Sequence, residues 1–343
     1  MTAPRGVTGM LPPIDWELAI GTGSRLIPAG PQVTPAEAAE AVAELRAGAT
    51  RAQPLVAETA QLTAPPDSAP VLIVDRRSWL RANVESMRGV LGGDPPGERN
   101  RRPGRGGRAA AVELGSVLAW LGTKVLGQFD PFHAPAGRLL LVAPNVLHAE
   151  RQLGADPHDF RLWVCLHEET HRVQFTARAW LRDHLRAEMD GLLAGLDLNT
   201  PAFGELLNRL RNDAAGATLL DLIGADATDT RNRVERVTAL MSLLEGHADV
   251  VMDRVGPEVI GSVTQIRQRF ERRRSGRGLD KVVRRLLGMD LKLAQYRDGA
   301  RFCRAVVDRV GFTGFNQALA SPAELPSLAE IHDPDAWLRR MGA

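Results

Sequence analysis

Apolar residues recur at helical spacing over most of the second half of this chain. From residue 156 almost to the C-terminus they fall three and four positions apart, the pattern of helices with one buried face. No repeat of fixed period accompanies this pattern, so it predicts a helical array rather than a solenoid. Glycine, proline and serine interrupt the pattern, and we expect breaks at 195–201, 224–228, 256–257, 275–278 and 311–314.

The first half mixes helical and strand patterns. Its opening is polar and turn-rich as far as Thr34, where Thr34 followed by Pro35 predicts the start of a helix. Short apolar runs predict strands at 71–75 and 137–144, and helical spacing predicts helices at 35–47, 77–91 and 109–126. The fold class expected from both halves is mainly α, of the α+β type, with a small β-sheet and a large helical C-terminal half.

Composition narrows the class of protein further. The chain has 343 residues and a formal net charge of +2, and nearly all of its positive charge is arginine. Arginine-rich segments therefore reflect a general bias, and the run at 267–285 has too few interleaved aromatic residues to indicate a nucleic-acid partner. Cys165 and Cys303 lack C-x-x-C spacing and suit a reducing compartment. With no secretory leader or membrane-spanning run in the sequence, we expect a cytoplasmic protein with no membrane partner.

The segment 163–171 contains an H-E-x-x-H motif formed by His167, Glu168 and His171. Asp156 can cap a helix here and Pro157 suits its first turn, so a helix should run through the motif. Histidines four residues apart share one helix face and can both reach a zinc ion at about 2.0 to 2.1 Å. Glu168 projects to one side of that face, which suits a general base beside the metal.

A catalytic zinc site needs a third protein ligand. The metzincin pattern would place glycine and histidine where this chain has Gln174 and Ala177, which excludes that subclass. A better candidate is Glu245, because it shares an apolar helical stripe with Asp249 and a buried carboxylate needs a partner. Asp249 could then accept the N–H of a ligating histidine. The competing ligand is His247, which lies on roughly the opposite side of this helix from Glu245.

These motifs resemble the gluzincin pattern, and the chain as a whole resembles a bacterial, mostly actinobacterial, family of zincin-like metallopeptidases often labelled as associated with deazaflavin-coenzyme biosynthesis. The resemblance implies a predominantly helical metallopeptidase-like fold with zinc ligands at His167, His171 and Glu245. It implies no particular substrate, and nothing in the sequence resembles a deazaflavin-binding motif. The stretches that carry the resemblance are 15–19, 127–131, 138–145, 167–175, 244–253 and 295–300.

The function expected is a zinc-dependent hydrolase, a metallopeptidase or amidohydrolase with one Zn²⁺ per chain and a peptide or amide substrate. Glu168 would take a proton from water and donate it to the leaving amine. Tyr296, the chain's one tyrosine, is the candidate donor for the developing oxyanion. The alternative is an inactive zinc-stabilised scaffold or interaction protein.

The domain organisation expected is an N-terminal region of helix and strand and a catalytic region packed with it as one unit. The first covers 1–108 and ends in a Gly-, Pro- and Arg-rich loop at 92–108, which has almost no apolar residues to bury and should be mobile. The second covers 109–343 and contains the zincin-like metal-binding motif. The sequence leaves the oligomeric state open.

Overall fold

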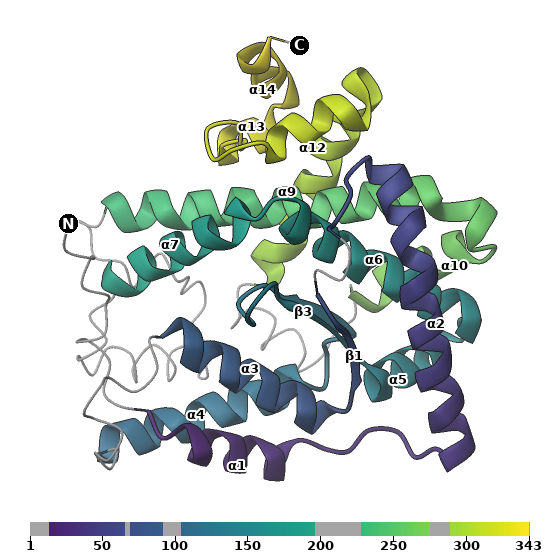
Figure 1. Cartoon of the computed structure of the whole chain (residues 1–343), viewed down its shortest axis with the longest axis vertical. Coiled ribbons are helices and arrows are strands. Elements are labelled where there is room, and N and C mark those ends of the chain that lie inside the picture. Colours follow the sequence, from purple (N-terminus) through teal and green to yellow (C-terminus); the bar gives the residue numbers. More distant parts are fainter. Residues whose placement is uncertain (1–13, 66–68, 92–103, 196–227, 275–288, 343) are drawn as a thin grey trace. The chain divides into compact units, whose positions relative to one another are not determined.

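The structure is a computed structural model of the whole chain, and it describes residues 14–65, 69–91, 104–195, 228–274 and 289–342 (Figure 1). Side chains at 193–195, 270–274 and 289–297 lie outside that description. The described part is mainly α with a small sheet, which confirms the expected fold class. None of its helices has the length and apolar character needed to cross a membrane.

The described chain divides into two compact units, which are taken in turn. The first comprises residues 1–55, 64–172 and 257–266, and the second comprises 56–63, 173–256 and 267–343. The expected division at residue 108, with both regions packed as one unit, stays a prediction. Both α6 (Pro157–Ala177) and α9 (Thr228–Val259) are continuous helices that pass from one unit to the other.

The first unit contains a three-stranded sheet with the order β1-β3-β2. β1 (Val71–Val74) pairs in parallel with the fully buried β3 (Arg138–Val142), with Val71 opposite Leu139. β2 (Gly127–Asp130) runs antiparallel to the other side of β3, with Gly127 opposite Leu141. β2 therefore forms one edge of the sheet.

Helices of the first unit pack on this sheet and on one another. Trp16, Trp79, Leu118 and Leu140 belong to one buried cluster, which joins α1, α3, α4 and β3. α1 and α4 approach closely because Gly115 has no side chain, and a Cβ there would overlap the backbone of Ala19. The helices are α1 (Trp16–Leu26), α2 (Pro35–Ala60, extending into the second unit), α3 (Arg76–Val90), α4 (Arg105–Leu121) and α5 (Ala143–Leu153).

The second unit is helical. α9 and α12 (Met289–Phe315) meet where Gly246 faces Gly299, and a Cβ on either glycine would overlap the other helix's backbone. Gly246 thus permits a close approach of the two helices. Trp337 packs edge-on against Phe302 at 5.7 Å between ring centroids. The other elements are α7 (Trp180–Gly195), α10 (Val263–Arg274, entering from the first unit), η2 (Asn316–Leu319), α13 (Leu328–His332) and α14 (Pro334–Met341).

Several predicted boundaries are corrected by the structure. The opening segment expected to be turn-rich contains α1, and the helix expected over 35–47 continues to Ala60. The run predicted as a strand over 137–144 ends at Val142, and α5 follows at once. α9 passes through the break expected at 256–257, whereas a kink at Gly311, with φ of 68°, matches the last predicted break.

The loop predicted over 92–108 is partly outside the described residues. Its last four residues are helical, because α4 begins at Arg105 after the N-cap Gly104. The breaks expected at 275–278 and at most of 195–201 and 224–228 lie outside the description. These parts of the sequence prediction stay predictions.

Candidate metal centre

The helix that contains the H-E-x-x-H motif forms as its sequence predicts. The Asp156 carboxylate accepts a hydrogen bond from the Asp159 backbone N–H at 2.9 Å, and Pro157 occupies the first position of α6. The helix then continues without interruption to Ala177. The motif therefore lies in the middle of a regular, well-supported helix.

His167 and His171 aim their imidazole rings at one point. Their Nε2 atoms are 3.2 Å apart, and the ring planes are nearly perpendicular at 89°. Two nitrogens bound to one tetrahedral zinc at about 2.0 to 2.1 Å are roughly 3.3 Å apart. The separation of the two nitrogens thus fits joint ligation of a single ion.

The two adjacent glutamates of the motif have different surroundings. Glu169 is fully buried, and Arg172 donates to both of its carboxylate oxygens at 2.7 and 2.6 Å. Burial raises the pKa of Glu169, and the hydrogen bonds and charge of Arg172 oppose that shift. Glu169 and Arg172 therefore form a buried ion pair that belongs to the packing of α6.

Glu168 instead lies over the edge strand of the sheet. A Cβ on Gly127 would come within 2.5 Å of Glu168 Cγ and 2.7 Å of its Cδ, so the glutamate side chain occupies the space that glycine leaves. The Glu168 side chain is buried at this position. Gly127 was not predicted from the sequence to belong to the site. The one signal for it in the sequence is a glycine at the first position of a very short strand.

The backbone of β2 beside Glu168 faces away from β3. Val142 N–H donates to Leu126 O at 2.9 Å, and hydrogen-bonded pairs alternate along an antiparallel ladder. Leu126, Gln128 and Asp130 therefore direct their backbone groups to β3. The N–H and C=O of Gly127 point to the outer edge of the sheet, next to the Glu168 carboxylate.

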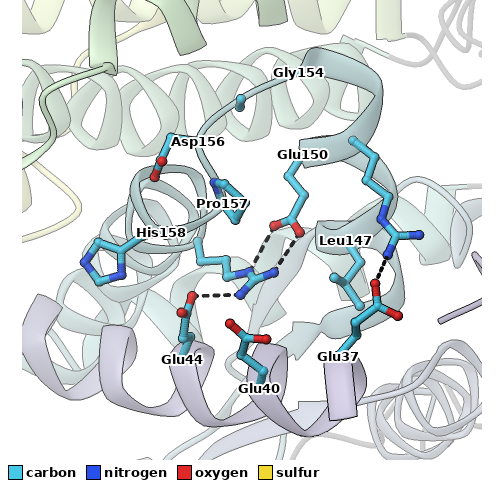
Figure 2. A pocket seen from close by; sticks show the side chains of 12 residues that line it. Glu37, Glu40, Glu44, Leu147, Glu150, Gly154, Asp156, Pro157 and His158 are labelled. Atoms are coloured by element: carbon cyan, nitrogen blue, oxygen red, sulfur yellow. Dashed lines mark hydrogen bonds and ion pairs between the residues drawn. The ribbon is translucent and has the colours of Figure 1, made fainter. Parts of the chain in front are cut away.

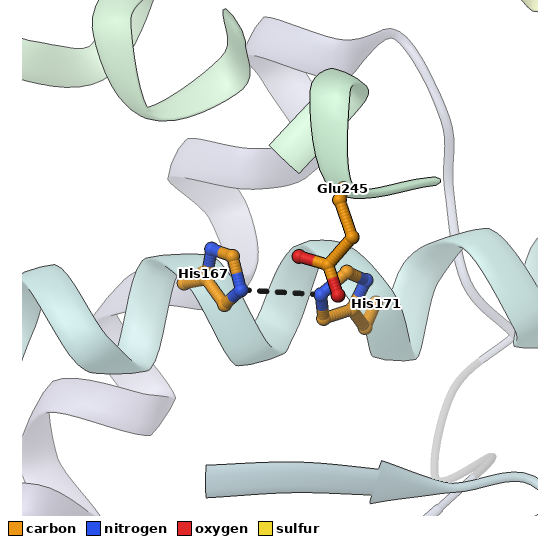
Figure 3. Close-up of side chains that lie close together, drawn as sticks. All are labelled: His167, His171 and Glu245. Carbon is orange, nitrogen blue, oxygen red and sulfur yellow. Dashed lines mark hydrogen bonds between the residues drawn. The ribbon is translucent and has the colours of Figure 1, made fainter. Parts of the chain in front are cut away.

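Glu245 is half-buried on α9. Among the side chains that the structure describes, one group of His, Cys, Asp and Glu could hold a metal, and it consists of His167, His171 and Glu245 (Figure 3). One ligand atom from each lies within 4.8 Å of the others. These are the three residues that the sequence predicts as zinc ligands.

His247, the competing ligand, is buried in the second unit. Its Nδ1 accepts a hydrogen bond from Gln174 Nε2 at 2.9 Å, and its ring stacks on Phe315 at 4.8 Å between centroids. A neutral imidazole that accepts at Nδ1 has its proton on Nε2, and a nitrogen with a proton cannot ligate a metal. This hydrogen bond therefore argues for Glu245 over His247.

Asp249 and Tyr296 were the other two predicted site residues. Asp249 lies one turn after Glu245 on α9, where Arg267 Nη2 donates to its backbone oxygen at 3.0 Å and lies 3.9 Å from its carboxylate. Tyr296 falls within α12, but its side chain is outside the described set. The roles assigned to these two residues stay predictions.

The two cysteines are both buried. Burial, and less strongly the nearby Glu168 and Glu169 charges, raise the pKa of Cys165 to about 12. Burial also raises the pKa of Cys303 well above its ordinary value. Neither cysteine belongs to the candidate metal group of the described residues.

A second polar region is the cavity of about 630 Å³ that α2, α5 and the start of α6 line in the first unit (Figure 2). Two arginines of its lining pair with three of its glutamates. Arg161 donates to Glu150 at 2.7 and 3.0 Å and to Glu44 at 2.7 Å, and Arg151 pairs with Glu37 at 3.0 Å. These ion pairs connect the three helices, which gives the cavity lining a structural role.

A helix that directs two histidines to one point with a glutamate between them is the metal-binding arrangement of the zincins. The family profile described as zincin-like metallopeptidase matches residues 14–338, and the chain therefore belongs to that family. A crystal structure from Chloroflexus aurantiacus, described as a candidate hydrolase with a novel fold, is 32% identical with a TM-score of 0.70. The match covers 96% of this chain and 99% of that one. No curated protein matches the chain.

Proposed function

We propose that this protein is a zinc-dependent hydrolase that cleaves peptide or amide bonds, with one zinc ion held by His167, His171 and Glu245. The observation that carries the proposal is the 3.2 Å separation of the two histidine Nε2 atoms. Family membership and the hydrolase description of the Chloroflexus protein support the reaction class. Two imidazoles and a carboxylate, with an open fourth position, are the donor set of catalytic zinc sites.

Bound zinc would supply Lewis acidity, which polarises a scissile carbonyl and favours deprotonation of water near neutral pH. Glu168 is the general base in this proposal. Its carboxylate removes the proton from the attacking water and returns it to the nitrogen of the leaving amine. Glu169 is unsuited to this task because Arg172 already occupies both of its oxygens.

The edge of the sheet supports a peptide as substrate. The N–H and C=O of Gly127 are directed outward beside Glu168, and an extended peptide can bind such an edge as an additional strand. A substrate aligned in this way would present its own backbone amide to the base. The edge strand thus favours a peptide over a compact amide.

Two further residues complete the proposed site. Tyr296 is the candidate donor to the developing oxyanion, and a Tyr296→Phe variant should then lose kcat with little change in KM. Asp249 is the candidate acceptor for the N–H of a zinc-binding histidine. Both assignments follow from the sequence pattern.

The activity is tested with a mixed peptide library incubated with the zinc-loaded protein, with cleavage products detected by mass spectrometry. The proposal expects cleavage that a chelator abolishes and that added zinc restores. Zinc binding with no turnover on any library would instead favour the zinc-stabilised scaffold. The Glu168→Gln protein is the matched control for contaminating peptidases.

Gly127→Ala is expected to lower kcat by about 100-fold, because a displacement of roughly 1 Å in a catalytic group has effects of that size. The added methyl group would overlap the Glu168 side chain, which must then move. Zinc content should be unchanged, because Gly127 is not a ligand. Steady-state kinetics with a cleaved peptide measure the effect, and a kcat equal to that of the wild type would contradict this placement of Glu168.

A further inference from the structure

Local sequence alone does not fix the position of Glu245, the proposed third zinc ligand, relative to the two histidines. Glu245 is on a different helix from His171, and hydrogen bonds between these two helices join residues 70 and 73 positions apart in the sequence. Sliding α9 by one residue would move Glu245 by about 1.5 Å and turn it by about 100°. Metal–ligand distances tolerate only about 0.2 Å, so some contact must fix α9 against α6.

Gln174 makes that contact within the second unit. Its side chain is fully buried, and Nε2 donates both of its hydrogens to α9: one to Leu244 O at 2.9 Å, the other to His247 Nδ1 at 2.9 Å. Leu244 and His247 lie on either side of Glu245 in the sequence. The Gln174 amide therefore binds α9 at two points. These two bonds fix both the position of α9 along its own axis and its rotation about that axis.

α6 transmits this constraint to the histidines. Gln174 follows His171 by three residues in one uninterrupted helix, and residues at that spacing lie on neighbouring turns of the same face. The His247 ring is in turn held by stacking on Phe315 of α12. The acceptor of the second hydrogen bond is thus fixed by packing.

An apolar residue could fill the space of Gln174 but could not select one register of α9. Dispersion contacts change gradually with sliding, whereas two hydrogen bonds from a single buried amide are satisfied at one alignment and are costly to leave unmade. The amide therefore contributes specificity of alignment beyond the stability that any well-packed side chain would give.

We propose that Gln174 is a positioning residue for the metal centre: its two hydrogen bonds to α9 hold Glu245 in register with His167 and His171. This inference rests on the proposed function, because it assumes zinc at those three residues. Gln174 is not one of the three proposed ligands and acts through Glu245. Gln174, which stands where the metzincin pattern has glycine, therefore has a role in this site.

The test is zinc affinity, measured by competition with a chromophoric chelator, together with the visible spectrum of the Co²⁺-substituted protein. Gln174→Met, which is close in size but has no donor, is expected to weaken zinc binding by about 10- to 100-fold and to alter the Co²⁺ spectrum. Gln174→Asn, which keeps an amide too short to reach α9, should act in the same direction. In a Glu245→Ala background, Gln174→Met should cause no further loss.

Asn316→Leu is the matched control. Asn316 is another buried amide of the second unit, and its Nδ2 donates to Ala60 O at 2.9 Å and Gln61 O at 3.1 Å. It should lose stability but keep wild-type zinc affinity. Wild-type affinity in both Gln174 variants, with weak binding in Glu245→Ala, would overturn the inference and leave the proposed function standing. Equal losses in Asn316→Leu would also overturn it. A wild-type protein that binds no zinc would overturn the proposed function itself.

Discussion

Glu168→Gln is expected to lower kcat by about 10²- to 10⁴-fold while zinc content and stability stay near those of the wild type. Glutamine has the shape of glutamate and fits the same space over Gly127, but its amide cannot take a proton from water. The loss should appear in kcat, because the base acts in the transition state.

Steady-state kinetics on a cleaved peptide, with zinc measured in the same sample, give this result directly. If Glu168→Gln retained most of its turnover, Glu168 would not be the base. If it lost zinc together with activity, the residue would belong to the ligand set. Its neighbour Glu169 offers a matched substitution of the same chemistry on the same helix.

Glu169→Gln is expected to lower the free energy of unfolding by about 3 to 5 kcal/mol, because it removes one partner of a buried ion pair. Arg172 is itself buried, and both of its bonds to Glu169 are 2.7 Å or shorter. Burial raises the pKa of Glu169, so the pair forms against a desolvation cost. Denaturant unfolding of Glu169→Gln and of the matched Glu168→Gln protein measures the difference in their free energies of unfolding.

The double variant Glu169→Leu/Arg172→Met removes both charges and is the control for this prediction. It should recover much of the lost stability, because apolar residues of similar volume avoid the desolvation cost of a buried pair. A Glu169→Gln protein as stable as the wild type would show that the ion pair contributes little. If the double variant were less stable than Glu169→Gln, the loss of stability would be due to altered packing and not to the broken ion pair.

Strong local patterns predicted much of the fold. The apolar run at 71–75 and the helical spacing at 77–91 correspond to β1 and α3 to within one residue at each end. These segments have a periodic apolar face that packing on the sheet retains. Their sequences and their tertiary environment favour the same structure, which is why pattern reasoning worked there.

Other elements depend on partners that the local sequence does not reveal. β2 is four residues long with no β-branched side chain, and it is a strand because it pairs with β3. Pro144 is the last residue of the strand predicted over 137–144, but it lies at the start of α5, where its missing N–H has no helical partner anyway. The two glycines within α1 similarly concealed a helix whose close approach to α4 requires one of them, Gly23.

In the candidate site, too, some residues could be predicted from local sequence and others depend on tertiary contacts. Spacing within one helix was enough to predict that His167 and His171 share a face, because helical geometry is local. Glu245 was predicted as a ligand because a carboxylate on an apolar helical stripe needs a partner. That pattern does not show where Glu245 lies relative to the histidines. Gly127 and Gln174 act through tertiary contacts with distant segments, so their roles became visible only in the structure.

The most direct test of a zinc site at His167, His171 and Glu245 is metal content by mass spectrometry on purified wild-type protein and single variants. We predict about one zinc per chain in the wild type and in Glu168→Gln, and loss of zinc in His171→Ala and Glu245→Ala. Zinc retained in Glu245→Ala would contradict the third ligand and redirect attention to His247. A wild-type protein without any divalent metal would contradict the account as a whole.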